Sequence, residues 1–488
     1  MNLTDHLERG AREHPDRPAL RFAGQTTSYA DLAAAVRAFA AHLAAEGVRP
    51  GDRVALALPN RPELVVAYLG AIRLGAIAVT LSAQWQSPEL HHGLTDSGAT
   101  VLVADADRLA RIDPETRVGI RHVCAVEEFR AHLQATGGPG AAVQVEPDTP
   151  AAIVYSSGTT GTAKGCVLSH ANVVTNAEAK VEFLDLVGDD RLLLFVPLSH
   201  CFGQNAILNA GLEAGATVVL EDGFAPGRIE QLAARERPTR FFGPPTAFLA
   251  LLDAVDPAAL DCFTYYFSAA APLSVATALR FEDTFGRPVH QGYGLTETSP
   301  FATYNHREEI RLGSVGTAIT DVQLCVTDPD TGTELPVDEI GEVLVRGPNV
   351  MLGYWNRPDE TAAKLRDGWL RTGDLGRLDA DGYLSLVDRL DDMINVAGQK
   401  VFPAEVEAVL AAQPGVAAAA AYPVADPVFG QRVAATVVPA TGHPPRTEDL
   451  VAACRRQLAA YKVPQSIELA DTLPVSPTGK LLRRALRR

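Results

Sequence analysis

The sequence predicts an α/β protein. We expect a large amino-terminal domain of βαβ subdomains with parallel sheets, a small β subdomain, and then a small α+β carboxy-terminal domain. Helical and strand patterns alternate as far as Gly313, an order typical of βαβ units. After Gly313, short strands and turns such as GEVLVRG replace the helices. The length of 488 residues also exceeds the roughly 100–200 residues of a single domain.

The first third of the chain supplies helices and strands in regular order. ADLAAAVRAFAAHLAAEG is an alanine-rich helix that ends at Gly47, and ELVVAYLGAIRLG is a second helix between the strands RVALAL and ATVLVAD. The same pattern recurs further along, in RLLLFVP, ATVVLED, RIEQLAARER and TRFFGPP. Strands alternating with helices in this way predict parallel sheets covered by helices on both faces.

Three further segments are less obvious. PAAIVY predicts a short buried strand, and CVLSHANVVTNAEAK predicts the end of a strand followed by a helix that Ser169 caps. GVAAAAAYPV could form a helix by its alanine content, but Gly415 and Pro423 favour a strand instead.

The composition is that of a globular enzyme: 47% of the residues are hydrophobic and 21% are charged. No apolar run approaches the roughly 18 residues that span a bilayer, so we expect no membrane span. The amino terminus MNLTDHLERGAREHPDRP lacks the hydrophobic core of a signal peptide, which predicts a cytoplasmic protein. A net charge of -16 disfavours nonspecific binding to nucleic acid.

The cysteines and lysines indicate which kinds of site the sequence can form. The six cysteines show no C-x-x-C spacing, so we expect mostly buried free thiols rather than a zinc site or disulfides. Only six of the 43 basic residues are lysine, so a retained lysine is a candidate for a task that needs a compact ammonium group. Lys180 and Lys364 are expected to be ordinary surface residues.

The stretch YSSGTTGTAKG predicts a phosphate-binding loop. Its glycines allow close approach of the backbone to a ligand, and its hydroxyls can donate to oxyanions. It is not a Walker loop, because Ala163 and Gly165 stand where that motif needs glycine and a hydroxyl residue. A flexible linker has a similar composition, but the regular elements on both sides favour a phosphate cradle. The predicted loop residues are Ser156, Ser157, Gly158, Thr159, Thr160, Gly161 and Lys164.

Three later stretches carry related chemistry: QGYGLTETSP, WLRTGDLGRLDADGYLSLVDR and LPVSPTGKLLRR. Together with the phosphate loop, in this order and spacing, they resemble the adenylate-forming superfamily and in particular its acyl- and aryl-CoA synthetases. The likeness extends over essentially the whole chain, from SYADL to PTGK. It implies that ATP activates a carboxylic acid as an acyl adenylate, and that CoA then takes the acyl group.

The resemblance implies a role for each residue that matches a motif. Asp374 would bind the ribose hydroxyls with support from Arg389, Glu297 would bind Mg²⁺, and Thr296 would touch the α-phosphate. The adenine is expected to lie among Ala270, Ala271, Pro272, Gln291 and Tyr293.

The resemblance also implies that one part of the chain moves between the two steps. Residues 1–388 would form the adenylation domain, and residues 389–488 a mobile domain that turns about a hinge at Asp391. Lys480 would serve adenylation from this mobile domain. Ala397 and Gly398 would line the CoA tunnel after the rotation.

His200, in FVPLSHCFGQN, would gate the site beside the substrate carboxylate. The acyl pocket is expected to comprise His200, Cys201, Phe202, Gln204, Asn205, Phe242, Ser268, Ala269, Gly292 and Phe301. None of these is a lysine or an aspartate that could pair with the charges of an amino acid. We therefore expect a hydrophobic acid of aromatic, alicyclic or fatty type.

Alternatives to a CoA ligase remain open at this point. A stand-alone acyl-AMP ligase would load an acyl carrier protein instead, although GEVLVRGPNVMLGYWNRPDET lacks the insertion that such enzymes carry. A non-catalytic nucleotide-binding relative is a third reading, which Lys480 and Glu297 argue against. The oligomeric state could be monomer or homodimer.

Lys480→Ala tests the role that the resemblance gives to this residue. We expect acyl-adenylate formation to fall by about 10²–10³-fold or more, because an aimed cation is lost from the transition state. The free energy of unfolding should change by no more than about 0.5 kcal/mol, as for a surface substitution. The same variant, supplied with preformed acyl-AMP and CoA, should still make thioester. Equal loss of both half-reactions in a folded variant would contradict the assignment.

Overall fold

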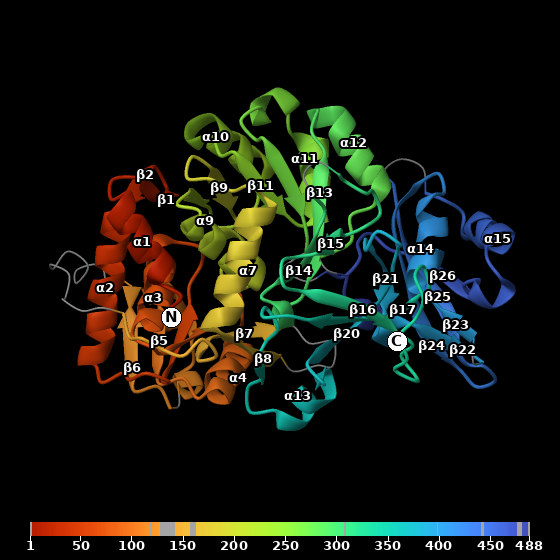
Figure 1. Ribbon diagram of the computed structural model, residues 1–488. Coiled ribbons are helices and arrows are strands. Elements are labelled where there is room, and N and C mark those ends of the chain that lie inside the picture. Colours follow the sequence, from red (N-terminus) through yellow and green to blue (C-terminus); the bar gives the residue numbers. More distant parts are fainter. Residues whose placement is uncertain are drawn as a thin grey trace. The chain divides into compact units, whose positions relative to one another are not determined.

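The computed structural model describes residues 2–117, 119–126, 142–156, 163–306, 309–397, 399–440, 444–475 and 481–486 (Figure 1). The chain forms two compact units. The larger comprises Met1–Leu324 with Val345–Arg371, and the smaller comprises Cys325–Leu344 with Thr372–Arg488. Each is a mixture of helices and sheet, so the predicted α/β class with a large first part and a smaller second part is confirmed.

A nine-stranded sheet forms one half of the first unit. Its strand order is β15 (Thr317–Ala318), β14 (Phe301–Tyr304), β13 (Val289–Gly294), β12 (Tyr265–Ser268), β11 (Arg240–Gly243), β9 (Arg191–Leu194), β10 (Thr217–Leu220), β1 (Pro18–Phe22) and β2 (Gln25–Ser28). Strands β13 to β1 run parallel, and antiparallel pairs close both ends. Because parallel strands share a direction, the carboxyl ends of β11, β12 and β13 meet at one edge, where ligands of such sheets bind.

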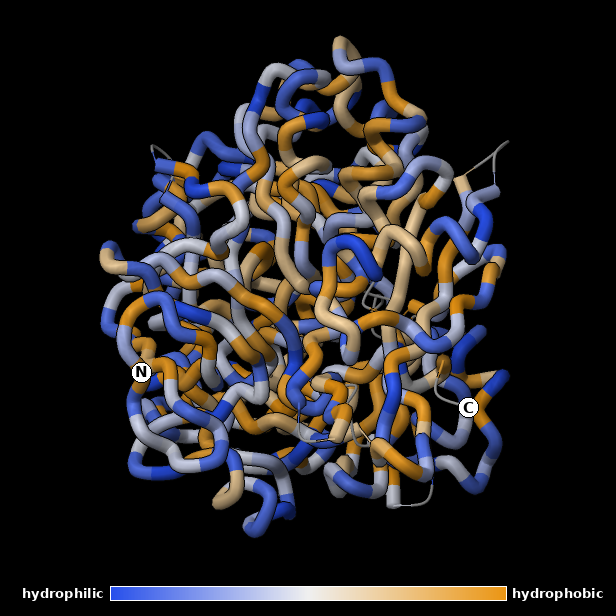
Figure 2. The backbone as a smooth tube through the Cα atoms, turned by 90° about the vertical axis from the view of Figure 1, so that its right-hand side faces the viewer, coloured by the Kyte–Doolittle hydropathy of each residue, from blue (hydrophilic) through white to orange (hydrophobic). Residues whose placement is uncertain are grey.

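A seven-stranded sheet forms the other half of this unit. Its order is β18 (Gly353–Tyr354), β8 (Lys164–Ser169), β7 (Pro150–Ser156), β4 (Ile77–Thr80), β3 (Arg53–Ala57), β5 (Val101–Ala104) and β6 (His122–Ala125). The central strands β4 and β5 are buried along their whole length. Parallel strands covered on both faces require such unbroken apolar sequences, and Figure 2 shows apolar segments running through the interior.

Helices connect and cover these strands. They are α1 (Asp5–Glu13), α2 (Tyr29–Ala45), α3 (Pro62–Arg73), α4 (Ser87–Ser97), α5 (Ala106–Arg111), α7 (His170–Phe183), α8 (Cys201–Gly203), α9 (Ala210–Glu213), α10 (Pro226–Glu236), α11 (Pro245–Ala254), α12 (Val275–Phe285) and α13 (Pro358–Lys364). Ser169 caps α7 as predicted, because its hydroxyl accepts a hydrogen bond from the Asn172 amide. None of the described helices is long and apolar enough to cross a membrane.

The predicted small β subdomain forms a third sheet. It contains β16 (Gln323–Thr327), β17 (Gly341–Arg346), β20 (Trp369–Leu378) and β19 (Leu365–Arg366), with β21 (Leu384–Arg389) paired to β20. The chain passes from one unit to the other within β16, β17 and β20. The division into two compact units does not test the predicted rotation about Asp391. The hinge therefore stays a prediction.

The second unit is built on a five-stranded sheet. It contains β23 (Gln399–Val401), β22 (Ile394–Val396), β25 (Gly430–Pro439), β24 (Val416–Asp426) and β26 (Ser466–Leu469), with helices α14 (Pro403–Ala411) and α15 (Thr447–Gln457). The alanine-rich GVAAAAAYPV forms strand β24, as predicted. Its small side chains pair along nearly all of β25, so cross-strand pairing overrides their helix propensity.

Arg483 ties the last described segment to this second unit. Its guanidinium lies 2.8 Å from Glu407, 3.3 Å from Asp392 and 4.0 Å from Asp388. The segment 481–486, which directly follows Lys480, is thereby fixed to α14 and to the end of β21. Burial raises the pKa of both Asp388 and Glu407 above the ordinary values, although the charge on Arg483 opposes this effect.

Arg483→Met should destabilise the second unit by about 3–5 kcal/mol at pH 7, because it leaves buried carboxylates without their cation. Since the folded-state pKa of Asp388 and of Glu407 already lies above the ordinary 3.8 and 4.5, both groups take up protons readily as the pH falls. The loss should therefore shrink between pH 7 and pH 5.

Urea unfolding, followed by hydrogen exchange of the α14 amides, measures this change. Arg456→Met, at an exposed position of α15, is the matched control and should stay within about 0.5 kcal/mol of the wild type. An equal loss at both pH values would contradict the role of the buried carboxylates.

Candidate active site

The predicted metal and phosphate residues converge on Tyr354. The hydroxyl of Tyr354 donates a hydrogen bond to Oε1 of Glu297 at 2.7 Å. Lys164 Nζ lies 5.4 Å from the centroid of the Tyr354 ring and forms an ion pair with Glu360. Burial, and then the charge on Glu297, raises the pKa of Tyr354, so this hydroxyl stays a neutral donor that orients the carboxylate.

Strand pairing explains this convergence. Ser156 and Lys164, at the two ends of the predicted phosphate loop, are cross-strand partners in β7 and β8. On the other side of β8, Tyr354 pairs with Cys166 in β18. Ser157, Gly158, Thr159, Thr160 and Gly161, which complete the predicted loop, lie outside the described residues.

Two buried asparagines hold the turn that carries Glu297. Asn176 on α7 and Asn349 both donate to the carbonyl oxygens of Thr298, at 3.3 and 3.1 Å, and of Phe301, at 2.8 Å each. Unpaired buried carbonyl groups are costly, so these amides add to the hydrogen bonds that the turn forms within itself.

Asn172, one helical turn before Asn176 on α7, completes the arrangement. Its amide donates to the carbonyl oxygens of Pro348 and Val350 at 2.7 and 2.9 Å, which fixes the loop that carries Asn349. We call Asn172, Asn176 and Asn349 the asparagine clamp. Sequence patterns did not predict it, and the only signal was the i, i+4 spacing of two asparagines on a predicted helix.

His200 is held in one tautomer. It precedes α8, and its Nδ1 accepts a hydrogen bond from the Phe202 amide at 3.2 Å, which leaves the proton on Nε2. The adjacent Cys201 is buried, and burial followed by the charge on Glu297 raises the pKa of its thiol.

Three predicted acyl-pocket residues, Phe202, Phe242 and Phe301, form a row of aromatic rings together with Phe267, which was not predicted. Ring centroids lie 5.9 Å apart for Phe202 and Phe301, 5.4 Å for Phe301 and Phe267, and 5.9 Å for Phe267 and Phe242. We call these four residues the phenylalanine row. It starts beside His200 and ends at the carboxyl end of β11.

Several predicted pocket residues carry buried polar atoms that form no hydrogen bond within the described structure. They are Oε1 of Gln204, Nδ2 of Asn205 and Oγ of Ser268. The first two lie in a π-helix, η2 (Gln204–Asn209), a distortion that is frequent at functional sites. Such atoms need a ligand or water as partner. Ala269, also predicted here, is buried directly after Ser268.

The structure corrects the prediction for Lys180. Its side chain is fully buried, and Nζ lies 4.1 Å from the centroid of the Phe242 ring and 5.2 Å from that of Phe301. The expectation of an ordinary surface residue was therefore wrong, and Lys180 lies against two phenylalanines of the predicted acyl pocket. Lys180 lies one helical turn after Asn176, on the face of α7 that packs inward, and this orientation follows from packing rather than from composition.

The predicted nucleotide residues fall in both units. In the first, Ala270, with φ of 74°, begins the turn of Ala271 and Pro272 that follows β12. Gln291 and Tyr293 lie two residues apart on the neighbouring β13, where Gln291 pairs with Ser268. In the second unit, Asp374 and Arg389 are cross-strand partners in β20 and β21, and their side chains form an ion pair of 2.8 Å.

The residues predicted for the hinge and the CoA tunnel belong to the second unit. Asp391 lies in a short 3₁₀ turn, η5 (Leu390–Asp392). Ala397 has a φ of 51°, and with Asn395 and Phe429 it lines an open hollow of that unit. Gly398 and Lys480 lie outside the described residues.

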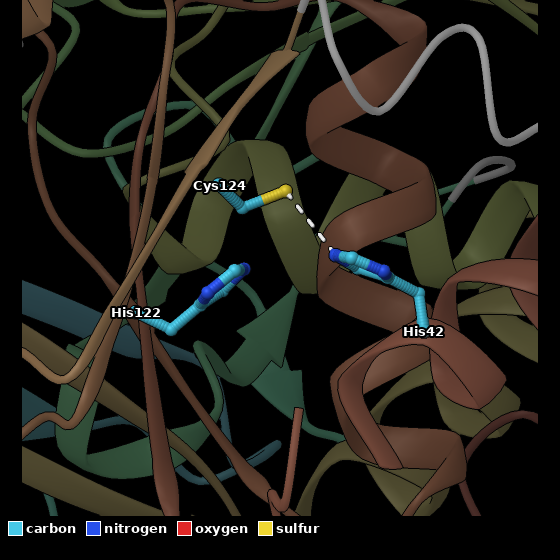
Figure 3. Close-up of side chains that lie close together, drawn as sticks. All are labelled: His42, His122 and Cys124. Carbon is cyan, nitrogen blue, oxygen red and sulfur yellow. Dashed lines mark hydrogen bonds between the residues drawn. The ribbon is translucent and has the colours of Figure 1, made fainter. Parts of the chain in front are cut away.

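The six cysteines, all among the described residues, form no disulfide bond, and all except the half-buried Cys325 are buried, as predicted. Cys124 faces His42 and His122, which brings three possible metal donors within 4.8 Å of one another (Figure 3). The thiol lies 4.0 Å from His42 Nε2, whereas donors that share a tetrahedral zinc lie roughly 3.4–3.6 Å apart. We therefore describe this contact as a thiol–imidazole hydrogen bond and assign no ion to it.

Two protein-family models match this chain, one over its larger first part and one near its end. Residues 7–355 match the model of the AMP-binding enzymes, and residues 405–480 match the AMP-binding enzyme C-terminal domain. The chain is 38% identical to a feruloyl-CoA synthase of Amycolatopsis sp, over 98% of this chain and 97% of that protein. It is 35% identical to a long-chain-fatty-acid–CoA ligase of Yersinia pestis, over 100% of this chain and 94% of the relative.

Solved structures agree with this result. ATP-bound MatB from Rhodopseudomonas palustris superposes with a TM-score of 0.94 at 32% identity, covering 100% of this chain and 98% of MatB. The o-succinylbenzoate coenzyme A synthetase of Bacillus subtilis, in complex with ATP and magnesium ion, gives 0.87 at 31% identity, covering 99% and 98% of the two chains.

Gly294→Ala tests the packing of the turn that carries Glu297. A Cβ at this position would overlap the backbone of Pro300, which cannot yield without moving the turn. We expect a loss of at least ~2 kcal/mol in the free energy of unfolding, measured by urea denaturation. Gly227→Ala is the control. This exposed glycine lies in α10 with nothing within 4 Å of its Cβ position, so alanine should be neutral or stabilising there.

Proposed function

The chain belongs to the AMP-binding enzyme family, and we propose that the acid it activates is aromatic and carries oxygen on its ring. It is an AMP-forming acid–thiol ligase that uses ATP, Mg²⁺ and CoA. In the first step, a carboxylate oxygen of the acid bonds to the α-phosphorus of ATP, and pyrophosphate leaves. In the second, the sulfur of CoA bonds to the acyl carbon, and AMP leaves.

Residues on two turns of the first unit can serve the adenylation step. His200 keeps its proton on Nε2 and can donate it in a hydrogen bond to the carboxylate of the acid. Glu297 offers the hard oxygen ligand that Mg²⁺ prefers, and the ion would offset phosphate charge there. Thr296 and Lys164 would contact phosphate oxygens from either side of Tyr354.

We further assign the residues of the second unit to binding and exchange. Asp374, held by Arg389, presents a carboxylate suited to a pair of ribose hydroxyls. The part of the chain beyond Asp391 would rotate after adenylation, withdrawing Lys480 and bringing Gly398 to the acyl adenylate. Two half-reactions at one carboxyl carbon require such an exchange of partners.

The choice of acid rests on one observation, the buried polar atoms of Gln204, Asn205 and Ser268 that have no partner in the described structure. An alkyl chain would leave these atoms unsatisfied, whereas a ring oxygen can accept from Nδ2 of Asn205 and a ring hydroxyl can donate to Oε1 of Gln204. The phenylalanine row supplies flat apolar surfaces for a ring. The sequence identity to the feruloyl-CoA synthase, 38%, is slightly higher than the 35% to the long-chain-fatty-acid–CoA ligase. This difference also favours an aromatic acid.

The free cysteines fit a reducing compartment, so we place the enzyme in the cytoplasm. CoA is the acceptor. An acyl carrier protein as a second acceptor, and a monomer or homodimer, stay predictions.

A pyrophosphate-release assay over matched acids tests the proposed substrate class. We expect hydroxylated and methoxylated aromatic acids to give a kcat/KM at least about 10-fold above that of fatty acids of similar length. Omission of CoA should stop turnover after the acyl adenylate has formed. AMP and pyrophosphate should appear in equal amounts. A preference for fatty acids would contradict the aromatic assignment, and ADP as the product would contradict the reaction itself.

A further inference from the structure

The buried face of α7 carries a line of three polar side chains at i, i+4 and i+8, namely Asn172, Asn176 and Lys180. Their exposed fractions are 5%, 1% and 0%. The two asparagines belong to the asparagine clamp, and each donates to two backbone carbonyl groups. Polar groups are rarely buried without such partners, so the third member of the line needs an explanation of its own.

Lys180 has no hydrogen-bond acceptor among the described residues. Its Nζ lies 4.1, 5.2 and 5.5 Å from the ring centroids of Phe242, Phe301 and Phe267. No described carboxylate pairs with it, although 59 acidic residues were available to the sequence. A side chain that served only to fill this space would be apolar, since a buried amine without an acceptor costs free energy that a methionine would not.

The phenylalanine row connects this amine to the reaction end of the site. Phe202 follows His200 by two residues, and its ring meets that of Phe301. Phe301 in turn lies four residues after Glu297 and contacts Phe267, whose ring meets that of Phe242. A ring placed along this row with its carboxylate at His200 would direct its far edge toward Lys180, whose Nζ lies 4.1 Å from the Phe242 ring centroid.

We propose that Lys180 Nζ is the recognition group for a hydroxyl on the far edge of the aromatic acid. This inference rests on the proposed aromatic substrate and specifies it further, as a phenolic acid with its hydroxyl opposite the carboxylate. A phenolic hydroxyl both donates and accepts hydrogen bonds, which matches an amine that lacks an acceptor.

The electrostatics of the position agree with this ligand. Burial lowers the pKa of Lys180 well below its usual value, which favours the neutral amine. A neutral amine donates through its N–H groups and accepts through its lone pair, so it suits a neutral hydroxyl. A second carboxylate in the same place would instead demand a full ammonium ion among phenylalanine rings.

The test compares 4-hydroxycinnamate with cinnamate in the pyrophosphate-release assay. We expect the wild type to prefer the hydroxylated acid by at least about 10²-fold in kcat/KM, because a buried polar group rejects an analogue that leaves it unpaired. In Lys180→Met this ratio should fall to within about threefold. Lys364→Met removes another lysine of the same unit, one that donates to the Arg371 carbonyl group, and should keep the wild-type ratio.

Stability gives a second, independent readout. If Lys180 acts only through cation–π contacts with the rings, Lys180→Met should lower the melting temperature and leave the preference for 4-hydroxycinnamate over cinnamate unchanged. That result would overturn the proposal. We expect the melting temperature of the variant without substrate to be equal or higher. Should Lys180→Met not fold, Lys180→Gln keeps a donor and an acceptor and should retain part of the preference.

The outcomes separate this inference from the proposed function. A wild type that activates aromatic acids but does not discriminate the hydroxyl overturns the role of Lys180 alone. Preference for a dicarboxylic acid such as 4-carboxycinnamate over both test acids would likewise overturn the phenolic assignment. A wild type that uses only fatty acids overturns the aromatic substrate, and with it this inference.

Discussion

The turn that carries Glu297 and the loop that leads to Tyr354 both depend on the buried face of a single helix. Helix α7, the yellow helix in the middle of Figure 1, contributes Asn172 and Asn176 to carbonyl groups that regular secondary structure leaves unpaired. Those carbonyl groups belong to the turn that carries Glu297 and to the loop that leads to Tyr354. The helix thus sets the position of both partners of the 2.7 Å hydrogen bond at the predicted metal site.

The clamp is not interchangeable with apolar packing. Replacing Asn172 would take away the donor to the Pro348 and Val350 carbonyl groups in the interior, where each unpaired group costs about 1–3 kcal/mol. Because Asn349 donates to the same oxygens as Asn176, the two amides must be placed together, and Asn172 achieves this by fixing the loop of Asn349. One helix face therefore determines several contacts at once.

In the second unit, buried polar groups are paired by ion pairs rather than by amide hydrogen bonds. Arg483 binds carboxylates that burial would otherwise push toward the neutral form, and so holds the segment that follows Lys480. The proposed movement of Lys480 into and out of the active site would benefit from a firm attachment immediately beyond this residue. The basic sequence LLRRALRR gives no hint of this, because the carboxylates lie about 75–95 residues earlier in the chain.

Sequence patterns predicted the elements well and the site in part. Apolar runs identified the strands around the phosphate loop, and Ser169 marked the start of α7, since both depend on local chemistry. The pairing of Asp374 with Arg389 confirms that two motif residues share one region. Asn349, Tyr354 and the burial of Lys180 could not be predicted, because they follow from β18 pairing with β8 and from the packing of α7.

Amide donors with protein partners support the turn that carries Glu297, whereas some buried polar atoms of the predicted acyl pocket have no partner among the described residues. The asparagine clamp donates its amide hydrogens to identified partners, and it holds the turn that carries Glu297 in place. Beyond it, Gln204, Asn205, Ser268 and Lys180 all keep buried polar atoms without protein partners among the residues that the structure describes. Such atoms lower the stability of the free enzyme, and a ligand that pairs with them recovers that free energy on binding. An enzyme that discriminates between acids of similar size gains selectivity from this arrangement, because an acid lacking the matching oxygens recovers none of it.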